Sequence, residues 1–400
     1  MTYRLTDDHD DLRAAVRELA EERIAPRAAQ IDDRAEFPWD LRELLARQDL
    51  IGIAFEERYG GTALDGIGQA IVIEEIARAD ATTSLIPIVQ KLGSLPIILA
   101  GTDEQKERYF PRLASGEWLA AFALTEAAAG SDVASNRMRA VRDGDDYVLN
   151  GSKRFITHGS IANVVTVFAL TDPSAGGRRG MSAFIVETDT PGFSAPRLEH
   201  KMGIRGSPTA ELNFDDVRVP AANRLGEEGE GFRIAMQTLD HSRLGIAAQA
   251  VGIAQGATDA AVAYAGQRQQ FGERIADLQG IQFMLADMAS QTEAARQLTY
   301  AAAAQADDGA ADLPYWSSSA KLVAGDTAMR VTTDAVQIFG GYGYIAEYPV
   351  ERMMRDAKIT QLYEGTQQIH RVIVARQILE RAGVGARRPS REPATAGSRS

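Results

Sequence analysis

The amino-acid sequence changes character twice, and this order of segments restricts the fold more than any single motif does. Residues 1–118 carry apolar side chains at helical spacing, whereas residues 119–228 contain short apolar runs rich in β-branched and aromatic residues. Long Ala-rich helical patterns return in residues 229–385. We therefore expect a helical domain, a β domain and a second helical domain. Residues 386–400 lack apolar anchors, and we expect them to form a disordered tail.

The first segment contains several helix signals. Thr6 is expected to cap a helix, because Asp residues follow it and can interact with the positive end of the helix dipole. Pro26 interrupts the helical pattern that begins there. Further helices are predicted over Trp39–Gln48, Gly66–Ala79 and Asp103–Leu113.

The second segment contains turn and strand signals. The dipeptides Asp143-Gly144 and Asn150-Gly151 are typical of tight turns. Strands are predicted over Val164–Leu170, Met181–Val186 and Leu212–Val219, where β-branched and aromatic residues are frequent. The number of strands stays open at this stage.

The third segment is expected to form a bundle of long helices. Helices are predicted over Phe232–Tyr264, over Gln279–Ala306, over Trp316–Phe339 and after Pro349. Gly245, Gly252 and Gly256 have the spacing that lets two helices approach closely.

The composition excludes several classes of function. The chain of 400 residues has no cysteine, which removes disulfides, thiolate nucleophiles, iron–sulfur clusters and cysteine zinc sites. Its net charge of −12 argues against nucleic acid or an anionic membrane as a partner. Its start has no apolar core of a signal peptide, and no uninterrupted apolar stretch approaches the ~18 residues of a membrane span. We expect a soluble cytoplasmic protein whose redox chemistry, if any, comes from a bound cofactor.

Familiar catalytic motifs do not occur in the sequence. The five histidines are scattered without metal-ligand spacing, so no metal site is predicted. There is no nucleophile elbow, phosphate loop or Gly-x-Gly-x-x-Gly run, which weighs against common hydrolases and Rossmann dehydrogenases.

Three other runs of residues are candidates for a ligand-binding or catalytic site. Phe122–Asp132 joins apolar residues to small and hydroxyl side chains, which lets a large ligand approach backbone N–H groups. Gln337–Tyr344 is a glycine-rich break between helices, and Tyr363–Thr366 reads Tyr-Glu-Gly-Thr. Taken singly, each has a structural explanation: a strand end, a helix C-cap and an ordinary loop carboxylate.

Taken together and in this order, the runs resemble the acyl-CoA dehydrogenase family of flavoproteins over residues 1–382. Further matching runs are Asn150–Lys153, Phe155–Thr157, Gln267–Gly272, Gln279–Asp287, Pro349–Asp356 and Tyr363–Arg371. The nearest likeness is a bacterial short- to medium-chain or branched-chain subgroup. The resemblance implies an α+β fold with an N-terminal all-α domain, a middle β-barrel-like domain and a C-terminal four-helix bundle.

The resemblance also implies an activity and its partners. The family oxidises a fatty-acyl-CoA to the trans-2-enoyl-CoA with FAD, and usually passes the electrons to an electron-transferring flavoprotein. Glu364 stands at the position of the family's general base, and Gly365 beside it leaves room for substrate. Ser242 stands where isovaleryl-type relatives carry their base. A homotetramer is implied, because cofactor contacts in the family come partly from a neighbouring subunit.

Individual site residues follow from the matched runs. The implied FAD contacts are Phe122, Leu124, Thr125, Ser131, Phe155, Ile156, Thr157, Arg268, Phe271, Gln279, Gln337, Ile338, Gly340, Gly341, Thr366 and Gln368. The implied acyl-CoA contacts are Ser131, Asp240, Arg243, Gly365 and Arg376. Three residues depart from the family pattern: Ala127 replaces a proline, Phe155 replaces the tryptophan of many relatives, and Gln367 replaces a serine, which is a minor change.

Alternatives remain at this point. An acyl-CoA oxidase or a nitroalkane-type oxidase would share the fold, and a helical assembly protein could have kept the scaffold without the cofactor. Asp240 and Arg243 can also be an ordinary i,i+3 pair, and Arg376 a surface cation. Leu92-Gly93-Ser94 is expected to face the acyl tail.

Overall fold

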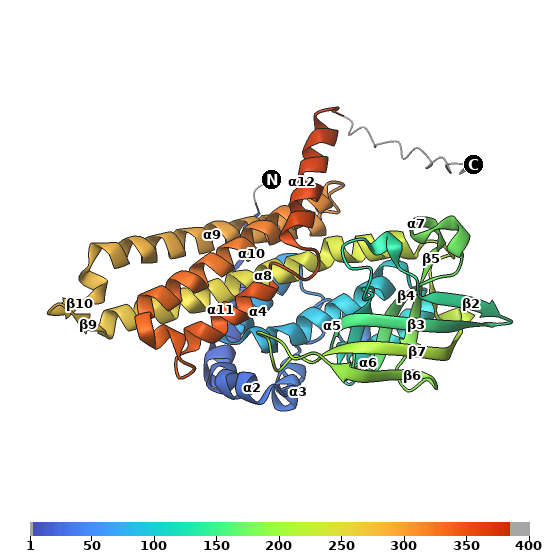
Figure 1. The fold of residues 1–400 in the computed structure, drawn as a ribbon, viewed down its shortest axis with the longest axis horizontal. Helices are drawn as coiled ribbons and strands as arrows, with labels where there is room; N and C mark the ends of the chain where they lie inside the picture. The colour runs from blue at the N-terminus through green and yellow to red at the C-terminus, as the bar shows by residue number, and fades with distance from the viewer. Residues whose placement is uncertain (1–2, 385–400) are drawn as a thin grey trace, which may run out of the picture.

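The computed structural model describes residues 3–384, and its elements follow the predicted order of helices, strands and helices (Figure 1). The first group consists of α1 (Asp7–Leu19), α2 (Ala28–Arg34), α3 (Trp39–Arg47), α4 (Gly66–Ala79), α5 (Ala81–Ala100) and α6 (Asp103–Ala114). The second consists of β1 (Ala120–Ala123), β2 (Arg139–Asp143), β3 (Asp146–Thr157), β4 (Val164–Leu170), α7 (Gly177–Gly180), β5 (Met181–Glu187), β6 (Phe193–Leu198), β7 (Thr209–Pro220) and β8 (Arg224–Leu225). The third consists of α8 (Gly231–Gln267), β9 (Gln269–Gln270), β10 (Glu273–Arg274), α9 (Gln279–Asp307), α10 (Leu313–Phe339), α11 (Pro349–Ile359) and α12 (Gln367–Arg381). The predicted tail over residues 386–400 lies outside the described residues, and the predicted domain limits stay predictions.

Thr6 caps α1 as predicted. Its side-chain oxygen accepts a hydrogen bond from the His9 N–H at 3.3 Å, and the His9 ring accepts one from the Thr6 N–H at 3.2 Å. The α-helix then gives way to a π-helical turn over Ala20–Ile24 and a 3₁₀ turn over Ala25–Arg27. Pro26 lies in that 3₁₀ turn and has no N–H to continue the α-helical pattern.

Helix α5 was not among the predicted helices, because Pro87 and Pro96 lie inside it. It packs against β1, α4 and α8 and belongs to the core. Within the described residues it is the one helix long and apolar enough to cross a membrane, and 72% of the window that meets this criterion is buried inside the protein. The expectation concerned uninterrupted apolar stretches, and α5 is not one, because polar residues such as Gln90 and Lys91 interrupt it; the helix packs here in the core.

The middle segment forms one curled sheet. The hydrogen-bonded order is β6-β7-β3-β2-β4-β5-β8, and β1 pairs with β4 in parallel. Side chains from strands that are not neighbours share one interior cluster: the rings of Tyr147 on β3 and Phe184 on β5 lie 4.9 Å apart. This curled sheet is the barrel-like domain of the predicted α+β fold.

The two predicted turn dipeptides behave differently. Gly144 follows Asp143 in the turn between β2 and β3, as predicted. Asn150-Gly151 lies inside β3 instead, where the register against β7 shifts and Gly151 has a φ of 141°. The predicted turn there is wrong, because a β-bulge uses the same backbone freedom as a turn.

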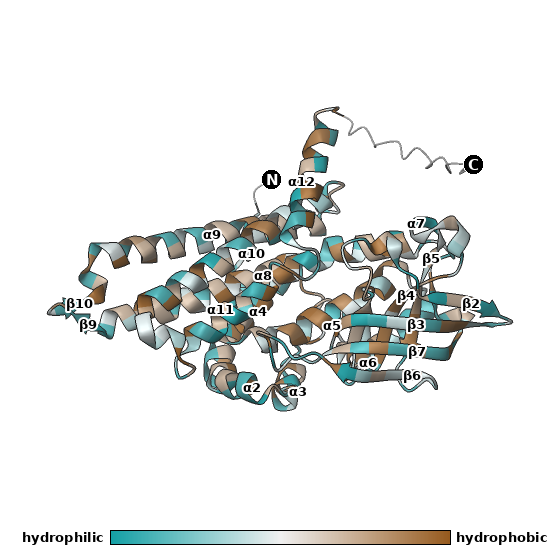
Figure 2. Cartoon of the chain, in the orientation of Figure 1, coloured by the Kyte–Doolittle hydropathy of each residue, from teal (hydrophilic) through white to brown (hydrophobic). Residues whose placement is uncertain are grey.

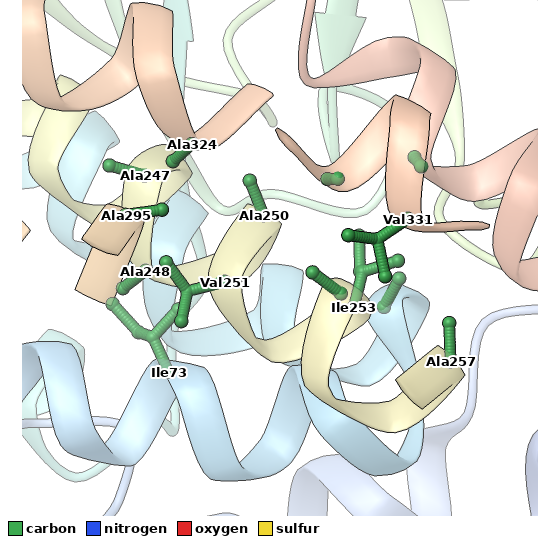
Figure 3. Close-up of a cluster of buried hydrophobic side chains, with 14 of the residues drawn as sticks. Ile73, Ala247, Ala248, Ala250, Val251, Ile253, Ala257, Ala295, Ala324 and Val331 are labelled. Atoms are coloured by element: carbon green, nitrogen blue, oxygen red, sulfur yellow. The ribbon is translucent and has the colours of Figure 1, made fainter. Parts of the chain in front are cut away.

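Helices α8, α9, α10 and α11 form the predicted bundle, with α4 packed along α8 (Figure 1). Small residues dominate the contact, as the close-up of Ala247, Ala250, Ala257, Ala295 and Ala324 shows (Figure 3). A Cβ on Gly252 or Gly256 would lie 2.3 Å from a backbone oxygen of α4, which confirms the predicted close approach at both positions. At Gly245 the nearest atom would lie 3.4 Å away, so a Cβ there has ordinary contacts.

Helix α12 packs on α10 and then projects from the body of the molecule (Figure 1). Its projecting part carries apolar residues, shown in brown in Figure 2. Val372 and Ile378 are 50% and 51% exposed. Exposed apolar surface of this kind on a helix is typical of a face that another chain covers.

Candidate active site

A cavity of about 980 Å³ lies where the β sheet, α5, α8 and the turn between α11 and α12 meet. Part of its wall is apolar and comes from Leu85, Ile88, Val89 and Leu92 of α5 and from Met236, Leu239 and Ile246 of α8. The predicted site residues that line it are Phe122, Leu124, Thr125, Ser131, Phe155, Ile156, Thr157, Arg243, Glu364, Gly365, Thr366 and Arg376. Runs that lie far apart in the sequence are thus brought to one cavity.

A buried lysine fixes the cavity wall that follows β1. Lys153 Nζ donates to the Leu124 carbonyl oxygen at 3.1 Å and to Glu126 Oε1 at 2.9 Å. The Glu126 carboxylate also accepts hydrogen bonds from two backbone N–H groups at 2.7 and 3.0 Å. Burial lowers the pKa of Lys153 to about 8, although the charge of Glu126 acts in the opposite direction. These contacts join the run that contains Leu124 to the run that contains Lys153.

The end of β3 is strained where it borders the cavity. Phe155 is 60% exposed and has a φ of 58°, a left-handed conformation that is unusual for an aromatic residue. His158 has a φ of 60°, and its buried Nε2 atom has no hydrogen-bond partner within the described residues. Thr157 lies between these two residues. Backbone strain of this kind concentrates where a fold positions a ligand.

Glu364 lies in the turn between α11 and α12. Its φ is 51°, and that of Gly365 is 100°. A Cβ on Gly365 would lie 3.0 Å from Nε2 of His370. Besides leaving space for substrate, as predicted, this glycine has two structural reasons to be there, its backbone conformation and the histidine behind it.

The Glu364 carboxylate contacts α8. Ser242 Oγ donates a hydrogen bond to Glu364 Oε2 at 2.5 Å. Burial raises the pKa of Glu364, whereas this hydrogen bond and the charges of Arg243, Lys321 and Lys91 lower it. The net effect is a pKa above the ordinary value, so the carboxylate has a higher affinity for a proton than an exposed glutamate.

Lys321 of α10 is completely buried beneath the same turn. Its Nζ atom donates to the Gly365 carbonyl oxygen at 2.7 Å, and Nε2 of His370 lies 3.0 Å from that oxygen. Burial lowers the pKa of Lys321 to about 7 and the pKa of His370 to about 3. Lys321 was not predicted as a site residue, because its place in a long helical run does not show which turn of the chain it contacts.

The predicted acyl-CoA contacts are only partly in the cavity wall. Arg243 is buried, pairs with Asp240 Oδ1 at 2.5 Å, and donates from Nε to the Glu364 carbonyl oxygen at 3.4 Å. Asp240 does not line the cavity, so its described role is that of partner to Arg243. Arg376 lines the cavity from the exposed side of α12, while Gln368 is exposed and does not line it.

Of the three residues in the run predicted to face the acyl tail, only Leu92 borders the cavity, and its contact with an acyl tail stays a prediction. A Cβ on Gly93 would lie 2.6 Å from the Ala121 backbone nitrogen, and Ser94 is completely buried outside the cavity wall. Gly93 therefore lets α5 approach β1 closely. A side chain at Gly93 would not share the direction of Leu92, because adjacent residues of a helix point to different sides.

The remaining predicted cofactor residues lie at the far end of the bundle, near β9 and β10 in Figure 1. They are Arg268, Phe271, Gln279, Gln337, Ile338, Gly340 and Gly341. The Arg268 guanidinium lies 5.2 Å from the centroid of the Tyr342 ring, and Phe271 is 93% exposed. None of this group lines the cavity of its own chain.

Three domain models of a single family match the chain in order. The acyl-CoA dehydrogenase N-terminal domain matches residues 6–117, the middle domain residues 121–217 and the C-terminal domain residues 229–379. The chain belongs to the acyl-CoA dehydrogenase family. It is therefore a member of a family of flavin-dependent oxidoreductases.

Relatives within the acyl-CoA dehydrogenase family cover nearly the whole chain. Probable acyl-CoA dehydrogenase fadE25 of Mycobacterium leprae is 53% identical over 377 residues, which are 94% of this chain and 97% of that protein. Butyryl-CoA dehydrogenase from Megasphaera elsdenii is 46% identical, with a TM-score of 0.92 over 95% of this chain and 100% of that one. A glutaryl-CoA dehydrogenase from Mycobacterium smegmatis in complex with FADH2 is 30% identical, with a TM-score of 0.88 over 96% and 97% of the two chains. The acyl groups in these names differ, so the family alone does not define the substrate.

Proposed function

We propose that this acyl-CoA dehydrogenase family member binds FAD and converts a short- to medium-chain or branched acyl-CoA to the trans-2-enoyl-CoA, with Glu364 as the base. One observation carries the proposal. The half-buried Glu364 carboxylate, with its raised pKa, lies at a large cavity whose walls come from the runs that resemble the family.

The cavity residues suit a large planar cofactor. Phe155, Met202 and Leu362 line the cavity and are 60%, 59% and 48% exposed, so three large apolar side chains are available to a ligand there. Thr157 and Ser131 add hydroxyl groups to the same wall. When bound, FAD would supply the acceptor for the hydride that leaves the β carbon of the substrate.

The residues of the chain then account for proton removal. Glu364 takes the proton from the α carbon, and the negative charge that develops on the thioester oxygen needs a hydrogen-bond donor. The backbone N–H of Glu364 donates no hydrogen bond within residues 3–384, so it is available to that oxygen. The apolar side chains of α5 and α8 exclude water, which strengthens these electrostatic interactions.

A homotetramer is part of the proposal. Arg268 and its neighbours at the far end of the bundle do not reach the cavity of their own chain, yet an arginine fork suits a pyrophosphate. The exposed apolar residues of α12 offer a surface for a second copy. An electron-transferring flavoprotein as acceptor and a cytoplasmic location complete the proposal, and the family resemblance is their support.

Flavin absorbance tests this function. The purified protein, loaded with FAD, is mixed without oxygen with straight-chain acyl-CoAs from butyryl to palmitoyl and with isobutyryl-, 2-methylbutyryl- and isovaleryl-CoA. We expect bleaching with a subset of these, and slow reoxidation when air is admitted. No bleaching with any of them would contradict the proposal, and reoxidation by air at the turnover rate, with peroxide release, would favour an oxidase.

A further inference from the structure

The turn that carries Glu364 is held from two helices that are distant in the sequence. Ser242 of α8 contacts the side chain of Glu364, and Lys321 of α10 contacts the backbone beside it. Both side chains are buried, with 4% and 0% of their residues' surface exposed. Buried polar groups that do not contact solvent need a partner, and the partner here is the proposed base or its turn.

The Ser242 hydroxyl has one proton to donate. Its oxygen lies 2.5 Å from Glu364 Oε2 and 3.4 Å from the Leu239 carbonyl oxygen, so the proton points to the carboxylate. A hydroxyl that donates to a carboxylate stabilises its charged form. It also fixes one oxygen of Glu364 and leaves the other free to meet a substrate proton.

Lys321 acts on the backbone of the turn. Its ammonium group donates to the Gly365 carbonyl oxygen at 2.7 Å and lies 3.4 Å from Gln367 Oε1. The turn needs such support, because Glu364 occupies the left-handed region without being glycine. His370 supplies a second contact to the same carbonyl oxygen at 3.0 Å.

We propose that Ser242 and Lys321 are positioning residues that present the Glu364 carboxylate, ionised, to the α carbon of the substrate. This inference rests on the proposed function, since it assigns both residues to the base of that reaction. Ser242 holds Oε2 and favours the charged carboxylate. Lys321 holds the Gly365 carbonyl, so that the strained turn keeps one conformation, and its charge acts in the same direction as the hydroxyl.

Other titratable and charged groups surround the Glu364 carboxylate, and a substitution of Ser242 leaves all of them in place. The titratable and charged groups around Glu364 are Arg243 of α8, Lys321 of α10, Lys91 of α5, Tyr363 in the same turn and His370 of α12. Removing the hydroxyl alone therefore isolates its effect on the ionisation of the base.

The decisive experiment is the pH dependence of flavin reduction at saturating acyl-CoA, using the substrate that bleaches the wild-type protein fastest. For Ser242→Ala we expect the acid limb of the profile to move up by about one pH unit, because the charged carboxylate loses a hydrogen bond. Ser242→Thr should restore the wild-type profile. Ser290→Ala is the matched control, because Ser290 Oγ lies 3.3 Å from the Asp287 carbonyl in the same i−3 arrangement on an exposed part of α9.

Lys321→Met tests the backbone contact. We expect kcat to fall by about tenfold with KM changed less than about twofold, because the base is displaced while the acyl-CoA contacts remain. If this variant does not fold, Ser242→Ala and Ser242→Thr decide the proposal on their own. An acid limb of Ser242→Ala within about 0.3 pH unit of the wild type would overturn it.

The inference and the proposed function fail in different ways. Flavin bleaching by Glu364→Gln at the wild-type rate would show that Glu364 is not the base, and both would fall. An inactive Glu364→Gln combined with an unmoved Ser242→Ala profile would overturn only the inference.

Discussion

Replacing Lys153 by methionine should loosen the cavity wall that follows β1. The change keeps the length of the side chain and removes its ammonium group. The Leu124 carbonyl oxygen loses a donor at 3.1 Å, and Glu126 Oε1 loses one at 2.9 Å. The carboxylate, whose side chain is 11% exposed, would then be a largely buried charge without its ion-pair partner.

The loss of unfolding free energy in Lys153→Met depends on the hydrogen bonds that Glu126 and Leu124 keep. Breaking a buried ion pair by removing one partner costs about 3–5 kcal/mol of unfolding free energy. Glu126 keeps its two backbone N–H donors, and the Leu124 oxygen keeps the Asn136 side-chain amide at 2.8 Å. We therefore expect the lower end, about 3 kcal/mol, which corresponds to a melting temperature lower by roughly 5 °C.

The assay is urea unfolding followed by circular dichroism, together with the FAD content of the purified protein, at pH 7. Lys153→Met should lower both the urea midpoint and the FAD content, whereas the double variant Lys153→Met/Glu126→Gln should recover part of the midpoint because the unpaired charge is gone. Lys106→Met on α6 is the control, since the Lys106 side chain forms no hydrogen bond or ion pair within residues 3–384. A Lys153→Met midpoint and FAD content equal to those of the control would refute the reasoning.

Three further predictions concern stability and the catalytic turn. Gly252→Ala would place a Cβ 2.3 Å from the Glu74 carbonyl oxygen and should lower the unfolding free energy by about 1–3 kcal/mol. Gly266→Ala in the same helix is the control, because a Cβ there has nothing within 4 Å. Equal urea midpoints for the two variants would contradict the packing argument. Gly365→Ala adds a Cβ at a φ of 100°, 3.0 Å from His370, and should slow flavin reduction by about tenfold or more while the protein stays folded, as stopped-flow absorbance and circular dichroism would show. Between pH 8 and pH 10 the unfolding free energy should rise with pH. Burial lowers the pKa of Lys91, Lys153 and Lys201 to about 8 in the folded protein, so the unfolded chain binds more protons in this range. Urea midpoints that fall as the pH rises from 8 to 10 would contradict this prediction.

The order of segments was predictable because helical and strand periodicities are local properties of the sequence. The signals at Thr6 and over Gly66–Ala79 are local too, and both are confirmed. Helix α5 was not predictable from the same rules. Its two internal prolines are tolerated because tertiary packing against β1, α4 and α8 offsets the lost helix hydrogen bonds.

The candidate site was predictable where the family runs supply cavity residues, as at Phe155 and Glu364. The residues that hold the site in place were harder to find. Lys321 and Lys153 act through contacts with residues 44 and 29 positions away in the chain, and no spacing rule reports such contacts. The sequence indicated only that Ser242 stands where isovaleryl-type relatives carry their base. In the structure its hydroxyl donates a hydrogen bond to Glu364.

The most direct test of the central claim is anaerobic flavin reduction by acyl-CoA in the Glu364→Gln variant. The amide keeps the size of the side chain and cannot accept the α proton as a carboxylate does. We predict a variant that binds FAD and acyl-CoA as the wild type does but reduces the flavin more slowly by about a hundredfold or more. Bleaching of the flavin at the wild-type rate would contradict Glu364 as the base.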